Sequence, residues 1–216
     1  MIHLPVKLKI VAACLSFIAG YVDALGFVHF GGYFVSFMSG NTTRMGVSGA
    51  MHPSLMILPA SLLLLFILGV VIGTLLAKVR PNRGHVQLDA IAAILAFSAL
   101  LAMLHLNTTA ALLTPVAMGA MNTIFQRNGE VSVGVTYMTG TLVKLGQRLA
   151  VALIGGDRWA WRPYFLLWLG LALGAVCGAL IYPRIGLAGL GLPAAALFTL
   201  GRSPVFSMRP TALVDP

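Results

Sequence analysis

The chain has 216 residues, of which 59% are hydrophobic and only 9% are charged, and its net charge is +9. A soluble domain carries about 25% charged residues because its surface faces water. This composition argues against a soluble enzyme and a disordered chain, and it indicates a polytopic membrane protein. The basic excess does not predict nucleic-acid binding, because the Lys and Arg residues lie between apolar runs, as in cytoplasmic loops.

A membrane-spanning helix needs about 20 apolar residues, and on that scale the chain divides into eight segments. These are residues 8–29, 33–50, 55–77, 86–106, 109–126, 131–153, 164–182 and 185–201. The second and sixth segments are short, rich in Gly, Ser and Thr, and interrupted by a basic residue. The first begins with two lysines like a secretory signal, but its apolar stretch continues too far, so we interpret it as a retained helix.

Internal repetition is the most informative pattern. The sequence FMSGNTTRMG at residues 37–46 recurs as YMTGTLVKLG at residues 137–146. Three further matches keep the same order, namely Gly20 and Asp23 with Gly119 and Asn122, Leu68-Gly69-x-x-x-Gly73 with Leu169-Gly170-x-x-x-Gly174, and Pro81 with Pro183. The matches predict a duplicated unit of about 100 residues. We therefore expect a first membrane repeat at residues 1–106, a second at residues 107–201, and a cytoplasmic tail at residues 202–216.

The distribution of basic residues decides how many times each repeat crosses the membrane. If all eight segments span, nine Lys and Arg residues lie inside and five outside, whereas re-entrant second and sixth segments give twelve inside and two outside. Short loops rich in Lys and Arg prefer the cytoplasm, so the second arrangement is favoured. Three spans per repeat is an odd number, so the second repeat is inverted, as in many secondary transporters.

The predicted fold is therefore an all-α membrane protein. It has about six transmembrane helices plus two re-entrant or broken segments, arranged as two inverted repeats. Both termini are expected on the cytoplasmic side.

Asp23 is the first candidate functional residue. It lies about 22 Å along the first helix, in the outer third of the apolar layer. An ionisable group at that depth is costly and normally faces a partner or a water-filled cavity. Two interpretations stay open: a carboxylate for proton coupling or cation binding, or a structural carboxylate that caps the neighbouring half-helix or pairs with Arg44.

The middle of the first re-entrant segment carries the second group of candidates, Ser39, Gly40, Asn41 and Thr42. Irregular backbone inside a bilayer needs such polar partners, and Gly40 permits a tight turn. These residues either line a solute site or only satisfy and pack the turn.

The second repeat offers Asn122, Thr139, Gly140 and Thr141 at the matching places, so a site at the repeat interface would carry its ionisable group in the first half only. Arg44 and Lys144 could hold an anion between them. The favoured interpretation is that Arg44 and Lys144 each extend their side-chain charge to the membrane interface.

The residues 20–27 (GYVDALGF) and 34–43 (FVSFMSGNTT) resemble the YoaK-type family of bacterial integral membrane proteins. The resemblance covers nearly the whole chain. It implies a location in the bacterial inner (plasma) membrane and supplies no substrate.

The function expected from these patterns is transport or channel activity for a small-molecule solute, with a site at the repeat interface and proton coupling through Asp23 as one form of it. The alternative is a non-transport membrane scaffold or sensor that acts through partner proteins. We expect no enzyme, because Ser39 lacks a nucleophile motif and a partner His, and neither cofactor nor metal, because His and Cys are scattered. The expected partners are the lipid bilayer, the solute and a second copy of the chain.

Overall fold

The computed structural model describes residues 5–80, 84–127, 130–131 and 134–203. Within these ranges the helices are α1 (Val6–His29), α2 (Met38–Met51), η1 (Pro53–Met56), α3 (Ile57–Val79), α4 (Gly84–Met103), α5 (Asn107–Met121), α6 (Met138–Leu153), α7 (Arg162–Ile185), η2 (Gly186–Leu190) and α8 (Gly191–Gly201). Two-residue strands, β1 (Gln126–Arg127) and β2 (Glu130–Val131), form a small antiparallel pair. Apart from this strand pair the regular elements of the described residues are helices, so the predicted all-α class is confirmed.

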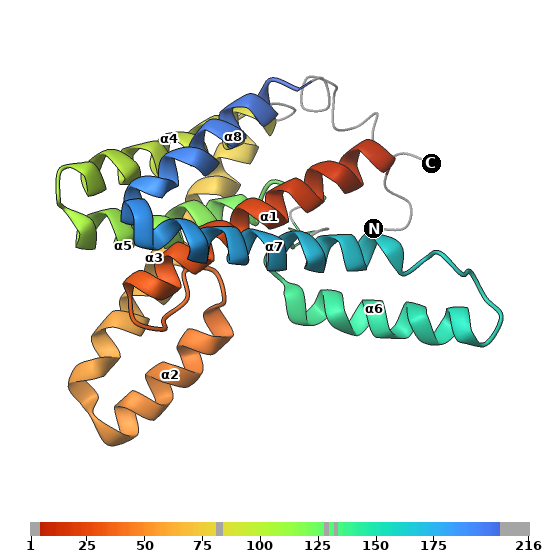
Figure 1. Ribbon diagram of the computed structural model, residues 1–216, viewed down its shortest axis with the longest axis horizontal. Coiled ribbons are helices and arrows are strands. Elements are labelled where there is room, and N and C mark those ends of the chain that lie inside the picture. Colours follow the sequence, from red (N-terminus) through yellow and green to blue (C-terminus); the bar gives the residue numbers. More distant parts are fainter. Residues whose placement is uncertain (1–4, 81–83, 128–129, 132–133, 204–216) are drawn as a thin grey trace.

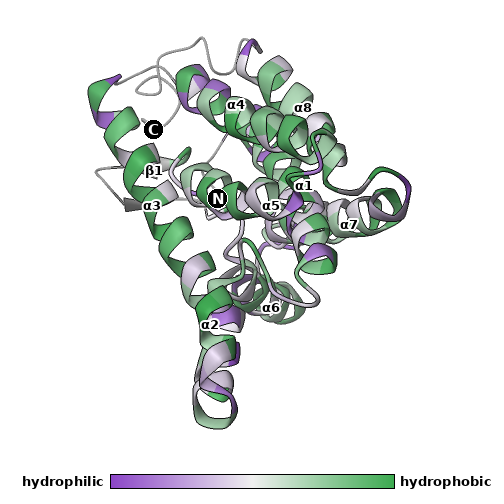
Figure 2. Ribbon diagram, turned by 90° about the vertical axis from the view of Figure 1, so that its left-hand side faces the viewer, coloured by the Kyte–Doolittle hydropathy of each residue, from purple (hydrophilic) through white to green (hydrophobic). Residues whose placement is uncertain are grey.

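Four helical stretches of the described chain are long and apolar enough to cross a membrane. They are Val6–His29, Pro53–Val79, Gly84–Met103 and Arg162–Gly201. The last stretch turns back at Gly186, whose φ is 56°, and therefore contains α7 and α8 as separate helices. α3 is apolar over most of its length, as far as Lys78 in its last turn, whereas α2 is much more polar (Figure 2). A membrane protein is therefore confirmed, while the count of six spans remains a prediction.

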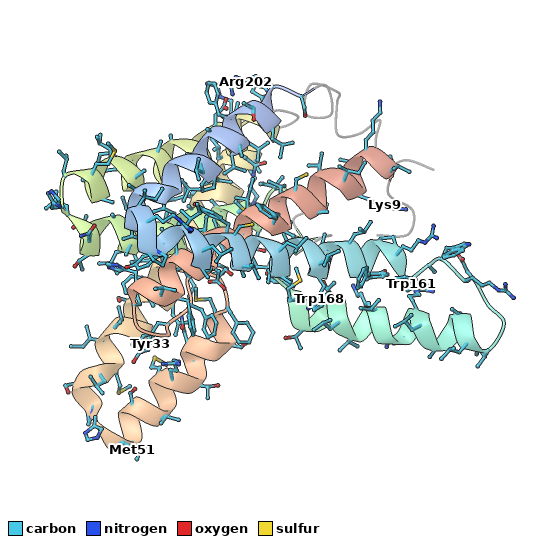
Figure 3. All side chains as sticks on the ribbon, in the orientation of Figure 1. Lys9, Tyr33, Met51, Trp161, Trp168 and Arg202 are labelled. Carbon is cyan, nitrogen blue, oxygen red and sulfur yellow. The ribbon has the colours of Figure 1, made fainter. Side chains whose placement is uncertain are left out.

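The core lies between α1, α4, α5, η2 and α8, where leucines interlock with small residues. Leu15 and Leu25 on α1 and Leu88 and Leu95 on α4 are fully buried. Two hairpins project from this bundle, one formed by α2 and α3 and the other by α6 and α7 (Figure 1). Met51 marks the tip of the first hairpin, away from the bundle (Figure 3). In each hairpin the shorter helix, α2 or α6, buries a single residue, Asn41 or Thr141.

The two closest helix pairs, α1 with α7 and α3 with α5, pack through glycines. A Cβ added at Gly174 would lie under 3.0 Å from the carbonyl oxygen of Phe17, and one at Gly178 would meet that of Tyr21. In the other pair, Gly69 lies against the carbonyl of Val116 and Gly73 against Ala120. Small residues let membrane helices approach closely enough for extensive van der Waals contact. The glycine-rich faces noted in the sequence therefore form both of these interfaces.

The same contacts fix the directions of the helices. Residue numbers rise together across α1 and α7, and across α3 and α5, so both pairs are parallel. Gly191 lies near Ala99, whereas Gly201 lies near Leu88, so α4 and α8 are antiparallel. The chain reverses between α3 and α4, between α4 and α5, and at Gly186 between α7 and α8 (Figure 1). Because α1 is parallel to α7, and both α7 and α4 are antiparallel to α8, the helices α1, α4 and α7 run in one direction. α3 and α5 are each reversed relative to α4. Therefore α1 and α3 run in opposite directions, as do α5 and α7. Hence α2 and α6 each connect two helices of opposite direction.

Candidate functional site

A loop of residues 30–37, called here the Asp23 loop, folds back from the end of α1 to the level of Asp23. Gly31 and Gly32 make the reversal, with φ values of 65° and 103° that residues with a Cβ rarely adopt. Asp23 Oδ1 then accepts hydrogen bonds from the backbone N–H groups of Val35 at 2.8 Å and Ser36 at 2.9 Å. A charged acceptor strengthens such bonds. The carboxylate is thus the anchor of the loop.

Asn41, in the first turn of α2, holds the Asp23 loop from the other side. Its Oδ1 accepts from the N–H of Phe34 at 3.0 Å, and its Nδ2 donates to the carbonyl of Phe34 at 2.6 Å. The Asn41 amide therefore pairs both backbone groups of Phe34, which lies outside regular secondary structure. The Phe34 ring packs between Phe27 and Phe37, with centroids 4.9 and 5.2 Å away. Asn41 is fully buried, as this clamp requires.

The second half of the chain holds a corresponding loop, residues 134–137, called here the Asn122 loop. Asn122 Oδ1 accepts a hydrogen bond from Thr136 Oγ1 at 3.0 Å, and Asn122 Nδ2 donates to the carbonyl of Met118 at 3.0 Å. Ser16 Oγ, on α1, lies 3.1 Å from the Val135 carbonyl oxygen. Val35 and Val135, which lie 100 positions apart, are both fully buried. Each half thus anchors a loop through the polar residue near the end of its first long helix.

The remaining predicted site residues divide by exposure. Thr141 is buried and donates to the Tyr137 carbonyl at 3.1 Å. Ser39, Thr42 and Thr139 are exposed, and the Thr42 hydroxyl donates to the Met38 carbonyl one turn earlier. The structure therefore brings Asp23 and Asn41 together against one loop and places Asn122 against another. It leaves the hydroxyls of Ser39, Thr42 and Thr139 on outward faces of α2 and α6.

The expected turn at Gly40 and Gly140 needs correction. Both residues lie in the first turns of continuous helices, α2 and α6, and neither has a positive φ. The reversal occurs earlier, at Gly31 and Gly32, because the end of α1 supplies the backbone acceptors there: the Gly32 N–H donates to the Phe27 carbonyl at 2.8 Å. Gly40 instead leaves room for the Phe34 and Phe37 rings.

The two basic candidates are not brought together. Arg44 lies over the Tyr33 ring, 4.9 Å from its centroid, and Lys144 is exposed on α6. Their helices belong to separate hairpins (Figure 1). Asp23 is bonded to loop backbone, and in the part of the chain that the structure describes the ion pair is Arg202 with Asp89 at 2.5 Å. Among the described residues no group of three or more His, Cys, Asp or Glu side chains could hold a metal ion.

The sequence prediction missed the loop residues that meet these anchors, namely Val35, Ser36, Val135, Thr136 and the hydroxyl donor Ser16. A signal for the first four existed, because Val-Ser and Val-Thr recur at the same offset of 100 as the adjacent repeated motif.

Comparison with known proteins places the chain in a family. The family described as Protein of unknown function (DUF1275) matches residues 11–202. The chain is 36% identical over 204 residues to a UPF0700 transmembrane protein of Rhizobium meliloti, covering 90% of this chain and 84% of that protein. No solved structure matches. The matches support the expected family of integral membrane proteins, although not the YoaK-type name itself. The chain belongs to the DUF1275 family and is a membrane protein.

Proposed function

We propose that the protein is a small-solute transporter or channel of the bacterial inner membrane, with six spans, two re-entrant segments and both termini in the cytoplasm. The helix directions support this topology, because a segment between two antiparallel spans enters and leaves on the same side. α2 and α6 are such segments. The topology also agrees with the preference of Lys and Arg for the cytoplasm.

Equivalent contacts support an inverted duplication. Asp23 and Asn122 anchor matching loops. In addition, α1 of the first half packs against α7 of the second, and α5 of the second half packs against α3 of the first. Gly20 approaches the Leu171 carbonyl and Gly119 the Phe66 carbonyl. These contacts become equivalent when Gly69 and Gly73 are matched with Gly174 and Gly178, one helical turn later than the sequence match with Gly170 and Gly174. The GxxxG spacing fits α7 in either register, and the contacts favour the later one.

The Asp23 loop is the proposed moving part. As a carboxylate, Asp23 accepts two backbone hydrogen bonds and holds the loop closed. Protonation removes the negative charge that strengthens those bonds, so it weakens the anchor and lets the loop open. Asn122 cannot change charge, so the Asn122 loop stays fixed. The single observation that carries the proposal is this pairing of a titratable anchor in one half with a neutral anchor in the other.

The solute path is assigned to the outward polar face of α2, with Ser39 and Thr42, and to the matching face of α6, with Thr139. Such a face is unfavourable against lipid and is normally turned toward protein or a water-filled cavity. Asn41, Gly40, Gly140 and Thr141 shape the loop ends beside this path. Arg44 and Lys144 remain proposed anion contacts at its margins.

Thiol labelling tests the moving loop without knowledge of the solute. The variants Val35→Cys and Val135→Cys, made without the native cysteines, place a thiol at corresponding buried positions. Dividing the first labelling rate by the second cancels the common effect of pH on the ionisation of a cysteine thiol. We expect this ratio to rise as pH falls from 8 to 5 and to stay constant when Asp23→Asn is added, because asparagine keeps an acceptor oxygen but cannot titrate. A constant ratio in the presence of Asp23 would show that the anchor is static.

Transport itself is tested in proteoliposomes. A dye that reports internal pH, with a panel of metabolites added outside, should show solute-dependent proton movement that Asp23→Asn abolishes while the protein stays folded. Reporter fusions at Arg80 and Leu104 test the topology, with the first expected in the cytoplasm and the second outside. An external signal at Arg80 would remove the inverted arrangement.

The alternative is a membrane scaffold, and one observation favours it: Asp23, Asn41 and Asn122 all find hydrogen-bond partners within the chain, as purely structural residues would. A scaffold gives a constant labelling ratio, no solute-dependent proton movement, and a stable complex with a partner or a second copy.

A further inference from the structure

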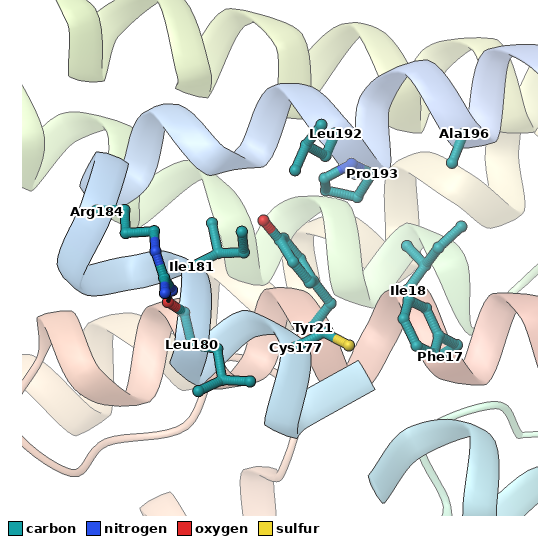
Figure 4. A pocket seen from close by; sticks show the side chains of 10 residues that line it. All are labelled: Phe17, Ile18, Tyr21, Cys177, Leu180, Ile181, Arg184, Leu192, Pro193 and Ala196. Atoms are coloured by element: carbon teal, nitrogen blue, oxygen red, sulfur yellow. Dashed lines mark hydrogen bonds between the residues drawn. The ribbon is translucent and has the colours of Figure 1, made fainter. Parts of the chain in front are cut away.

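We propose that a groove between α1, α7 and α8 binds an anionic membrane lipid, an activity separate from solute transport. The groove has a volume of about 540 Å³, within the range of about 300–1,000 Å³ typical of ligand sites. Its lining residues are Phe17, Ile18, Tyr21, Cys177, Leu180, Ile181, Arg184, Leu192, Pro193 and Ala196 (Figure 4).

The groove wall is almost wholly apolar. The Tyr21 ring stands in the middle of the lining, and its hydroxyl donates to the Gly189 carbonyl at 3.1 Å, so it is already satisfied. Leu180 and Leu192 are 58% and 56% exposed on the two sides of the groove. An apolar slot that is open sideways on a membrane protein faces hydrocarbon, so its natural occupant is an acyl chain.

Arg184 supplies the charge at one end of the groove. Its guanidinium donates to the Leu180 carbonyl one turn earlier on α7, which leaves further N–H donors for a ligand. Three carboxylates whose side chains the structure describes are engaged elsewhere: Asp23 with the Asp23 loop, Asp89 with Arg202, and Asp157 with the Trp159 N–H. An exposed arginine beside an apolar slot matches a phosphate headgroup followed by a fatty chain.

The position of Arg184 strengthens this assignment. In the proposed topology it lies at the outer end of α7, where the preference of basic residues for the cytoplasm predicts few of them. An arginine at that end of the helix has a specific binding partner if its guanidinium contacts the phosphate of an outer-leaflet lipid. The lipid site thus accounts for a residue that the topology alone does not explain.

The native cysteines provide the test. Cys177 lines the groove, whereas Cys14 is exposed on α1 and is not part of its lining. Wild-type protein in detergent is titrated with phosphatidylglycerol, and alkylation of each thiol by N-ethylmaleimide is followed by mass spectrometry. We expect the lipid to slow alkylation of Cys177 relative to Cys14, and phosphatidylcholine to do so only at about fivefold higher concentration. Arg184→Gln should remove this preference, and Lys78→Gln, which removes an exposed charge from the end of α3, should keep it.

A second variant keeps the test valid if Arg184→Gln does not fold. Ala196→Phe fills the groove from α8, so it should slow Cys177 alkylation without lipid and make it insensitive to added lipid. The proposal is overturned if phosphatidylglycerol leaves the ratio of the two rates unchanged or if phosphatidylcholine protects equally well. Protection by inorganic phosphate alone would also overturn it, because the site would then bind a free anion. The ratio of the alkylation rates of Cys177 and Cys14 reports on the groove alone. Its outcome therefore does not depend on the pH test of the Asp23 loop.

Discussion

Replacing Gly174 with alanine inserts a methyl group into the closest part of the interface between α1 and α7. The new Cβ would lie under 3.0 Å from the Phe17 carbonyl oxygen, whereas ordinary contacts of this kind begin at 3.4 Å. The Cβ position is fixed by the α7 backbone and the oxygen belongs to the α1 backbone, so no side-chain rotation relieves the clash and the two helices must separate. Such overpacking costs about 1–3 kcal/mol, while alanine gains about 0.8–1.0 kcal/mol in helix propensity over glycine. The difference is a net loss of about 0–2 kcal/mol. Because the clash is with backbone rather than with a movable side chain, we expect the upper half of that range, about 1–2 kcal/mol.

The assay is the midpoint of thermal unfolding in detergent, measured as the fraction of monodisperse protein that survives heating. A loss of that size should lower the midpoint by about 2–8 °C for a chain of this length. Gly46→Ala is the matched control, because a Cβ at Gly46 has nothing within 4 Å, and it should be neutral or stabilising. Gly69→Ala, the counterpart in the pair of α3 and α5, should lower the midpoint as Gly174→Ala does. The reasoning is refuted if Gly174→Ala and Gly46→Ala have the same midpoint.

Two further pairs of substitutions separate packing from hydrogen bonding at the loops. Gly40→Ala should destabilise the protein and Gly140→Ala should not, because a Cβ at Gly40 would lie 2.6 Å from the Phe37 ring whereas one at Gly140 has nothing within 4 Å; equal midpoints would contradict this difference. Asn41→Ala should cost about 1–3 kcal/mol, because it leaves the N–H and carbonyl of Phe34 without their partner, and it should expose the Asp23 loop to proteolysis. Thr42→Ala should cost at most about 0.5 kcal/mol, since Thr42 is exposed and its hydroxyl bonds only the carbonyl of its own helix.

The long apolar helices were predictable because one property, about 20 apolar residues, decides them. The predicted segments 55–77, 86–106 and 164–182 overlap closely with Pro53–Val79, Gly84–Met103 and Arg162–Ile185. The polar anchors Asp23 and Asn122 were identifiable for a related reason, since polar side chains within apolar segments are costly and need partners.

The partners of these anchors could not be read from the sequence. Glycine fits a turn and the first turn of a helix alike, so Gly40 looked as suitable for the reversal as Gly31 and Gly32. The backbone acceptors at the end of α1 decide between them. The register of α7 was ambiguous for a similar reason, because Gly170, Gly174 and Gly178 repeat at intervals of four residues. Contacts with α1, which are tertiary, resolve it.

Because α1 packs against α7 and α3 packs against α5, α1 and α3 must each wait during synthesis for a partner helix that is made later. α3 is completed about 30 residues before α5 begins, whereas α1 is completed about 130 residues before α7 begins. At a synthesis rate of about 5–20 residues per second, α3 waits a few seconds for its partner and α1 waits up to about half a minute. During that longer wait α1 lies in the membrane without its main partner while carrying a carboxylate. The hydrogen-bond partners of Asp23 are Val35 and Ser36, which follow it within 13 residues. These two backbone N–H groups are therefore available to the Asp23 carboxylate almost as soon as α1 leaves the ribosome, well before α7 is synthesised.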